Sequence, residues 1–490
     1  MTDRRSPFGA LLVPHLRWDP GHGFAYLDAL IEESLELGVG GFVVSGGPRD
    51  ALLALTQELD RRSRHPLLIA AALEAGVGGS FAGATGLPPL AAFGALRDDE
   101  AVRRAARLTA REARAHGVNW ALAPVCDLDL SPANPFLGSR AFGREAQRAA
   151  EWVVEWIDTC QSEGVLACAN RFPGTGRAVF DPSVARGSIE APAGVLWAED
   201  LLPFRAAVDS GVASVLVSAV GFPALDASRA PAAQSRTLLV QLLRDELHFD
   251  GLLLADLGEL VPHGDARAEA GEALAALAAG CDLLLAPSDP HAVVEAIESG
   301  IESGAVSIDA LEASLARREF WADWGRASPG REPTLDDVLW ARQVADLVVH
   351  PVRGVLPSVG PIVDLVVVDD DAASEGGGQS ARRPEPLLDT LRSLGLDPRE
   401  VEGPSAEGRG SVVIALFGEP HAGRARAGYQ EVTRRRVARA VADARQAQRS
   451  AVVLLFGPPR LAEEIPEVAN VVCCWSGSAA MQAAAARRLA

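Results

Sequence analysis

The chain contains no lysine, so all 46 of its basic residues are arginine. Schiff-base chemistry of the aldolase or pyridoxal type needs an amine nucleophile, and the absence of lysine excludes both. A standard phosphate-binding P-loop requires Gly-Lys-Ser/Thr and is excluded for the same reason. Compositional drift toward arginine explains most of this bias, and the chemical exclusions hold whatever its origin.

Sequence patterns typical of metal sites and disulfides are also absent. The six cysteines form no Cys-x-x-Cys pair and lie mostly in apolar runs, so we expect buried thiols rather than disulfides or zinc ligands. The nine histidines are scattered, with no His-x-x-x-His or His-Glu-x-x-His spacing. We therefore expect neither a metal ion nor an organic cofactor.

Long apolar runs are missing as well. No run approaches the roughly 20 apolar residues that span a bilayer. The run that follows Arg4 and Arg5 ends at about Leu16 without a small-residue cleavage site, unlike a signal peptide. The net charge of −19 argues against nucleic acid or an anionic membrane as the main partner. We expect a cytoplasmic protein whose ligand is a small molecule.

The first 305 residues alternate strand-like and helix-like segments. Short apolar runs are separated by amphipathic stretches, and several of these stretches end in glycine, as helices commonly do. Eight runs with intervening helices predict an α/β fold, a (β/α)8 TIM-like barrel. A doubly wound open sheet stays open as the alternative, because periodicity alone does not show closure. The runs are Gly9–Leu16, Gly41–Ser45, Pro66–Ala72, Asn119–Leu128, Val165–Ala169, Ser214–Val220, Gly251–Ala255 and Cys281–Ala286.

A smaller α/β sandwich domain is expected after the barrel, because 490 residues exceed one ordinary core. We predict a barrel domain over residues 1–325, a connector and linking helix over 326–352, and the second domain over 353–490. Helical spacing continues through Thr334–Val352, and residues 374–386 are expected to form a mobile loop. The strand-like runs of the second domain are Val363–Asp371, Ser411–Gly418, Ser450–Gly457 and Asn470–Trp475.

Polar side chains follow two of the barrel runs directly. Asp256 comes after four apolar residues, and Asn170 and Arg171 precede a Gly/Pro turn. In a barrel of this kind, reactive side chains gather at the carboxyl ends of the strands. Asp256 has two interpretations that the residues alone leave equal: a reactive carboxylate, or a cap on the following helix or loop.

Several segments together resemble the barrel domain of glycoside hydrolase family 3, in particular its bacterial β-N-acetylhexosaminidase branch. They follow one another in order, and the end of the chain is similar to the second domain of two-domain members. The resemblance therefore extends over nearly the whole chain. The segments are 117–143 (GVNWALAPVCDLDLSPANPFLGSRAFG), 169–176 (ANRFPGTG), 201–226, 248–256 (HFDGLLLAD) and 470–490.

The resemblance implies retaining hydrolysis of β-linked N-acetylhexosaminides or related β-glycosides, with a small carbohydrate as substrate. That mechanism uses a carboxylate nucleophile and a proton donor about 5 Å apart. Asp256 matches the family's nucleophile position. Asp127 and Arg140 match family positions that bind substrate, and Arg suits a bidentate grip on a polar group.

Other site positions depart from the family pattern. Where the family has Lys-His-Phe-Pro-Gly-His-Gly, this chain has Asn170-Arg171 followed by Phe-Pro-Gly-Thr-Gly, and Asn170 and Arg171 become the candidate substrate ligands. The family's Asp-Ser-His loop, whose His is the acid/base, reads Asp181-Pro-Ser here. A serine hydroxyl is a poor substitute for imidazole, because its pKa lies far from neutrality. Of the family's Asp-x-Glu-Gly-Gly-Arg motif, Glu74 is retained with one glycine.

Two explanations of these departures stay open. Either the site is rebuilt around a different sugar, for which the charge of Arg171 suits an anionic ligand, or the chain is a catalytically inactive homologue that binds a carbohydrate or a protein. An active enzyme needs another proton donor near Asp256. The candidates are Glu190, Glu259, His263 and Asp265.

Overall fold

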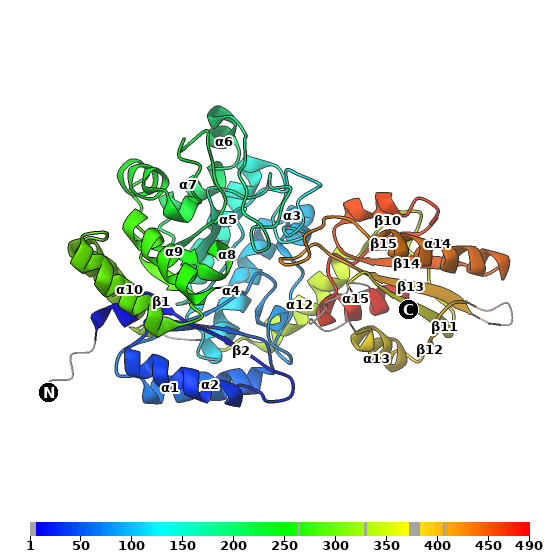
Figure 1. Ribbon diagram of the computed structural model, residues 1–490. Coiled ribbons are helices and arrows are strands. Elements are labelled where there is room, and N and C mark those ends of the chain that lie inside the picture. The colour runs from blue at the N-terminus through cyan, green and yellow to red at the C-terminus, as the bar shows by residue number, and fades with distance from the viewer. Residues whose placement is uncertain (1–5, 262–264, 328–330, 372–382, 405–407, 409) are drawn as a thin grey trace. The chain divides into compact units, whose positions relative to one another are not determined.

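The computed structural model describes residues 6–261, 265–327, 331–371, 383–404, 408 and 410–490 (Figure 1). The chain forms two compact units. The first contains Met1–Thr85, Asp99–Leu130 and Gly143–Thr334, and the second contains Gly86–Asp98, Ser131–Phe142 and Leu335–Ala490. The predicted domain boundaries at residues 325 and 353 stay a prediction. His263 and most of the predicted mobile loop, residues 374–382, lie outside the described residues.

The first unit is a closed parallel barrel. Pro14 has no N–H and divides the first strand into β1 and β2. β1 pairs with β9 and β2 pairs with β3, both in parallel. Parallel bridges from Trp120 to Leu166 and from Val125 to Asn170 join β5 to β6. The ring of eight strands therefore closes, which confirms the barrel over the open sheet. Its strands are β1 (Leu12–Val13), β2 (His15–Arg17), β3 (Gly41–Ser45), β4 (Leu68–Ala71), β5 (Trp120–Ala121), β6 (Cys168–Phe172), β7 (Ser214–Val217), β8 (Leu252–Asp256) and β9 (Leu283–Leu285).

The strands differ from the predicted runs at two places that matter for the site. β5 ends at Ala121, although the apolar run continues to Leu128, because Pro124 has no N–H to continue the ladder. β6 begins later than predicted and extends through Asn170 and Arg171. Both residues therefore belong to the strand itself rather than to the turn after it.

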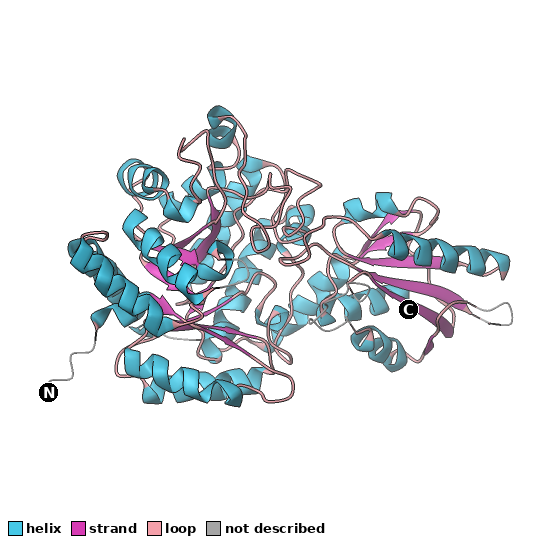
Figure 2. Ribbon diagram, in the orientation of Figure 1, coloured by secondary structure: helices cyan, strands magenta, loops and turns pink. Residues whose placement is uncertain are grey.

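Helices surround these strands (Figure 2). Their ends follow ordinary capping rules: α1 ends at Gly38 and α10 at Gly304, both with left-handed φ, and Asp289 caps α10 by accepting a hydrogen bond from Ala292 N at 3.0 Å. The helices are α1 (Asp28–Leu37), α2 (Arg49–Arg62), α4 (Asp99–Ala115), α5 (Ala146–Ser162), α6 (Ala193–Ala198), α7 (Leu202–Asp209), the π-helix η5 (Thr237–Glu246), α8 (Leu257–Leu260), α9 (Ala266–Ala279), α10 (Pro290–Ser303) and α11 (Ile308–Ala327), with short 3-10 turns at η1 (Pro7–Leu11), η2 (Ala25–Leu27), η3 (Val77–Gly79) and η4 (Ala232–Gln234).

A buried aspartate ties the helices to the amino ends of the last strands. Asp282 is completely buried just before β9 and accepts hydrogen bonds from Leu253 N at 2.7 Å and from Ser314 Oγ at 2.7 Å. Arg244 of η5 and Arg317 of α11 pair with it at 2.6 and 2.7 Å. The carboxylate is thus fully partnered, as a buried charge must be. It anchors the barrel at the end opposite to the carboxyl ends of the strands.

The second unit contains a six-stranded sheet of order β10-β15-β14-β13-β11-β12, in which only β10 is antiparallel to its neighbour among the described residues. The predicted α/β character is confirmed, but β10 and β12 were not predicted. The helix expected to reach Val352 ends at Val348, because Pro351 disfavours helical backbone at His350. The strands are β10 (His350–Arg353), β11 (Ile362–Asp369), β12 (Asp397–Glu400), β13 (Ser411–Phe417), β14 (Ala451–Phe456) and β15 (Val471–Cys473).

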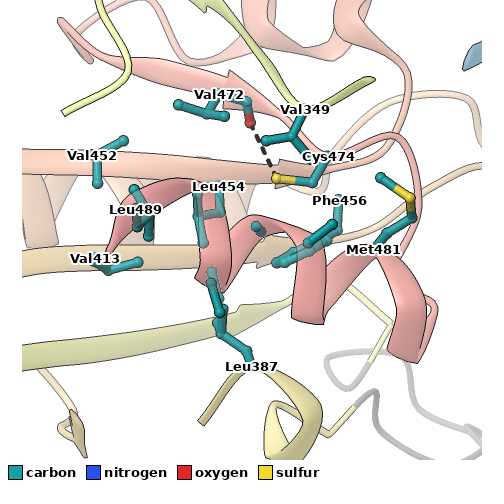
Figure 3. Packing of buried hydrophobic residues seen from close by; sticks show 14 of the residues in the cluster. Val349, Leu387, Val413, Val452, Leu454, Phe456, Val472, Cys474, Met481 and Leu489 are labelled. Carbon is teal, nitrogen blue, oxygen red and sulfur yellow. Dashed lines mark hydrogen bonds between the residues drawn. The ribbon is translucent and has the colours of Figure 1, made fainter. Parts of the chain in front are cut away.

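Two apolar cores cover the faces of this sheet. α14 packs on one face, and α12, α13 and α15 pack on the other. Figure 3 shows the core on the face covered by α12, α13 and α15. It includes Leu387 and Leu489 from the helices, and Val413 and Leu454 from the strands. Alternation along the parallel strands sends successive side chains to opposite layers, as in an α/β sandwich. The helices of this unit are α3 (Leu90–Leu96), α12 (Leu335–Val348), α13 (Glu385–Ser393), α14 (Glu431–Gln446) and α15 (Ala479–Leu489), with the 3-10 turn η6 (Pro459–Glu464).

The carboxyl ends of β11 and β13 meet where the strand order reverses, which is the usual ligand crevice of an open α/β sheet. Here a side chain of the protein occupies it. Asp370 is completely buried and accepts a hydrogen bond from Gln430 N at 2.9 Å at the start of α14. It also pairs with the buried Arg424 and, at 2.7 Å, with Arg426. An internal carboxylate thus takes the place of an external anion.

Three sequence expectations concern groups that the structure describes. All six cysteines are buried thiols, as expected. Within the described residues, no cluster of three or more His, Cys, Asp or Glu side chains is arranged to hold a metal ion. In the same part of the chain, no helix has the length and apolar character needed to cross a membrane.

Candidate active site

Asp256 is the last residue of β8, and its carboxylate also caps the next helix. Its Oδ1 accepts a hydrogen bond from Gly258 N at 2.9 Å in the first turn of α8. Burial raises the pKa of Asp256 above its usual value, while Arg171 and the backbone N–H groups of Gly258 and Glu259 oppose that rise. The capping interpretation and the reactive interpretation are therefore compatible, because the cap fixes one oxygen and leaves the other for chemistry.

Two side chains at the end of β6 carry buried polar atoms with no protein partner. Asn170 Nδ2 donates to Leu122 O at 2.8 Å, which fixes the amide, while its Oδ1 has no hydrogen-bond partner among the described residues. Arg171 Nε is in the same situation. Buried polar atoms are normally bonded, so each of these two atoms on consecutive residues is a candidate partner for a ligand group or an ordered water.

Arg171 pairs with Glu259, the third residue of α8. This contact joins the end of β6 to the segment that follows β8, and it lies beside Asp256. Arg171 is thus paired with Glu259, and its charge also acts to lower the pKa of Asp256. The positive charge of Arg171, which the sequence suggested for an anionic ligand, is balanced within the protein, and the cluster as a whole carries excess negative charge.

Asp127 is held by a residue that the sequence analysis passed over. Thr175 donates to it twice, from its backbone N at 2.5 Å and from its Oγ1 at 2.7 Å. Both residues are buried. The turn after β6 also passes so close to Leu128 that a Cβ at Gly176 would lie 1.8 Å from Leu128 O. The retained Gly/Pro turn therefore positions Asp127, and Thr175 occupies a histidine position of the family pattern as an anchor for that carboxylate.

Asp181 holds the turn of its own loop. Its Oδ1 accepts hydrogen bonds from Ser183 N at 2.9 Å and from Ser183 Oγ at 2.6 Å. Arg186 then fastens the same loop to the elements after β8, donating to Leu260 O at 3.1 Å and to Glu272 Oε1 at 2.6 Å. The loop therefore lies against α8 and α9, and the hydroxyl of Ser183 is already engaged with Asp181.

Glu74 and Arg140 are held by local structure. Glu74 lies after β4 in a turn closed by a bridge to Gly76. Arg140 belongs to the second unit, where its N donates to Leu137 O at 3.0 Å and the neighbouring Ser139 Oγ donates to Trp475 O at 2.9 Å. Convergence of all the predicted site residues on one pocket stays a prediction.

Among the described candidates for a replacement acid, Glu259 is the one in the first turn of the helix that Asp256 caps. Glu190 pairs with Arg229 at 2.8 Å, and both side chains are exposed. Asp265 is exposed and caps α9 by accepting from Arg267 N at 3.0 Å. His263 lies outside the described residues.

Comparisons with known proteins address the family and the fold. Residues 35–318 match the model of the glycosyl hydrolase family 3 N-terminal domain. A β-N-acetylglucosaminidase/β-glucosidase of Cellulomonas fimi is 30% identical over 75% of this chain and 69% of its own length. A β-hexosaminidase of Xanthomonas axonopodis pv. citri is 33% identical over 51% of this chain and 76% of its own length. The solved structure of a glycoside hydrolase family 3 β-N-acetylglucosaminidase from Paenibacillus sp. has the same fold, with a TM-score of 0.83 at 24% identity over 100% of this chain and 98% of that one.

Proposed function

The chain belongs to glycoside hydrolase family 3, and we propose that it hydrolyses terminal β-linked N-acetylhexosaminides with retention, using Asp256 as nucleophile. The observation that carries the proposal is the position of Asp256 at the carboxyl end of β8, with one oxygen fixed by Gly258 N at 2.9 Å. The names of its relatives, a β-N-acetylglucosaminidase/β-glucosidase and a β-hexosaminidase, supply the substrate class.

The chemistry assigned to Asp256 follows from that geometry. Its second oxygen attacks the anomeric carbon while the bond from that carbon to the leaving oxygen breaks, and the product is a covalent glycosyl ester. Water then cleaves the ester. Partial removal from solvent makes the ionised carboxylate a better nucleophile, and Arg171 opposes the rise that burial causes in the pKa of Asp256. The orphaned Asn170 Oδ1 accepts a hydrogen bond from a sugar hydroxyl or from the acetamido N–H.

Protonation of the leaving group is the step that this site supports least. Asp181 is the carboxylate at the acid/base loop position, but Oδ1 is engaged by both donors of Ser183. The Ser183 hydroxyl has a pKa far from neutrality and does not protonate a leaving group efficiently. We therefore expect the first step to depend steeply on the acidity of the leaving group. Activated aryl glycosides turn over, and natural disaccharides react slowly.

The test is a series of aryl β-N-acetylglucosaminides whose phenols span a wide range of acidity. Asp256→Asn should abolish turnover of all of them, whereas Asp250→Asn, the same change at an exposed position before β8, should leave it intact. Equal rates across the series would show that another residue already supplies the proton. No turnover of even the most activated substrate would refute the proposal and leave the binding-module interpretation.

A further inference from the structure

The ion pair between Arg171 and Glu259 lies in an unusual place. Glu259 is 5% exposed and the Arg171 side chain is 14% exposed, so both charges have lost most of their hydration. Buried ion pairs contribute little net stability, because desolvation offsets the attraction between the charges. The pair also leaves Arg171 Nε without a hydrogen bond among the described residues. Stability alone does not account for a buried pair at the end of two barrel strands.

The other elements around Asp256 contribute few charges. The neighbouring strands β7 and β9 are followed by Ser218 and Ala286, which are uncharged. On α9, which packs against α8, Glu269 accepts from Ser288 N at 2.7 Å, and Glu272 pairs with Arg186 at 2.6 Å. These carboxylates are therefore engaged elsewhere.

Arg171 and Glu259 reach Asp256 from different directions. Arg171 extends from β6, two strands away in the barrel, and Glu259 comes from the first turn of the helix that Asp256 itself caps. The short helix α8 is capped by Asp256 and contains Glu259, so the carboxylate that pairs with Arg171 lies three residues from Asp256 in the chain.

We propose that Glu259 is a positioning residue, which holds the Arg171 guanidinium beside Asp256 and divides its positive charge between the two carboxylates. The inference rests on the proposed role of Asp256 as nucleophile. Two opposite effects on the pKa of Asp256 follow. Removing the charge of Glu259 should lower that pKa, and removing the charge of Arg171 should raise it. Loss of the Glu259 charge leaves Arg171 free to favour ionised Asp256, whereas loss of the Arg171 charge leaves two carboxylates that repel each other.

The experiment measures covalent labelling of the full chain by a dinitrophenyl β-N-acetylglucosaminide with fluorine at the fifth carbon of the sugar. This probe needs no acid to expel its leaving group, so the acid limb of its second-order labelling rate reports the ionisation of Asp256 in the free protein. Intact mass identifies the adduct, and peptide mapping assigns it to Asp256. The variants are Glu259→Gln, which keeps a hydrogen-bond acceptor for Arg171, and Arg171→Met. Glu298→Gln, an exposed position on α10, is the matched control.

We expect the acid limb to move to lower pH by roughly half to one unit in Glu259→Gln and to higher pH in Arg171→Met, with no shift in the control. The inference would be overturned if the acid limb of the pH profile did not shift in Glu259→Gln, or if it shifted in the same direction in both variants. Glu259→Gln decides the sign even if Arg171→Met does not fold. Absence of any Asp256 adduct in the unmodified protein at every pH would instead overturn the proposed function.

Discussion

At the scale of single residues, the site contains substitutions whose partners have changed with them. Thr175 stands where the family pattern has a histidine, yet it donates two hydrogen bonds to Asp127. Asn170 stands where the pattern has a lysine, and its amide is fixed by Leu122 O. Such residues still organise the strand ends, although they no longer supply the same proton-transfer groups.

Thr175→Val should destabilise the protein by about 1–3 kcal/mol, because it keeps the shape of the side chain but leaves a buried carboxylate oxygen of Asp127 without its hydroxyl donor. Urea unfolding followed by circular dichroism measures the change. Thr175→Ser, which retains the hydroxyl, is the control and should lose less. No loss of stability in Thr175→Val would show that the hydrogen bond from the hydroxyl to Asp127 contributes nothing to stability.

Asp256→Asn should be at least as stable as the unmodified protein at pH 7. Burial raises the pKa of Asp256 in the folded state, so the fold favours its protonated form. Asp256 therefore stabilises the fold at a pH below its pKa in the unfolded chain. That stabilisation is lost as the pH rises through its higher pKa in the folded protein. Neutral asparagine avoids that loss. Thermal unfolding at pH 4 and pH 7 tests the sign, and a variant clearly less stable at pH 7 would contradict it.

At the scale of elements, the loop that contains Asp181 is the segment that decides the proton donor. Arg186 fastens it to Leu260 O and Glu272, and Ser183 closes its turn. The loop is therefore held against α8, the helix that Asp256 caps. We expect a proton donor introduced in this loop to lie on the same side of the barrel as Asp256.

Ser183→His should raise the rate on aryl glycosides with poor leaving groups and leave the rate on dinitrophenyl glycosides nearly unchanged. The imidazole has a pKa near neutrality, and Asp181 lies two residues away as its partner. Ser183→Ala, which removes the hydroxyl without adding a donor, should show no gain. A uniform change across all leaving groups would point to a rearranged loop, for which the ring of Pro182 offers a reason.

At the scale of the whole molecule, each of the two units is built from several separate segments of the chain, and these segments alternate along the sequence. α3 and residues 131–142 interrupt the barrel sequence but belong to the second unit. α3 packs against α12, with Ala92 in the apolar core of that unit, and Ser139 Oγ donates to Trp475 O. The second unit is therefore completed by two segments, Gly86–Asp98 and Ser131–Phe142, that lie far ahead of its main part, Leu335–Ala490, in the chain.

A chain ending at residue 334 should expose apolar surface, because Leu90, Ala92 and Phe93 of α3 are buried in the complete protein. We expect it to bind more of the dye ANS per molecule than the full chain and to aggregate at lower concentration. Fluorescence titration of both proteins makes the comparison. ANS binding no greater than that of the full chain would show that α3 finds other cover within the barrel.

The sequence by itself determined the alternation of strands and helices in the barrel, the placement of Asp256 at the end of a strand, and the family, because these depend on local periodicity and short motifs. Only the tertiary structure decided that Arg171 pairs with Glu259 and that Thr175 holds Asp127, since each pair is more than 45 residues apart and its register comes from strand pairing. The edge strands β10 and β12 escaped prediction for a related reason: their burial is partial, so their apolar pattern is weak. Closure of the barrel across Pro14 likewise depends on hydrogen bonds to strands distant in the chain, and no local pattern encodes them.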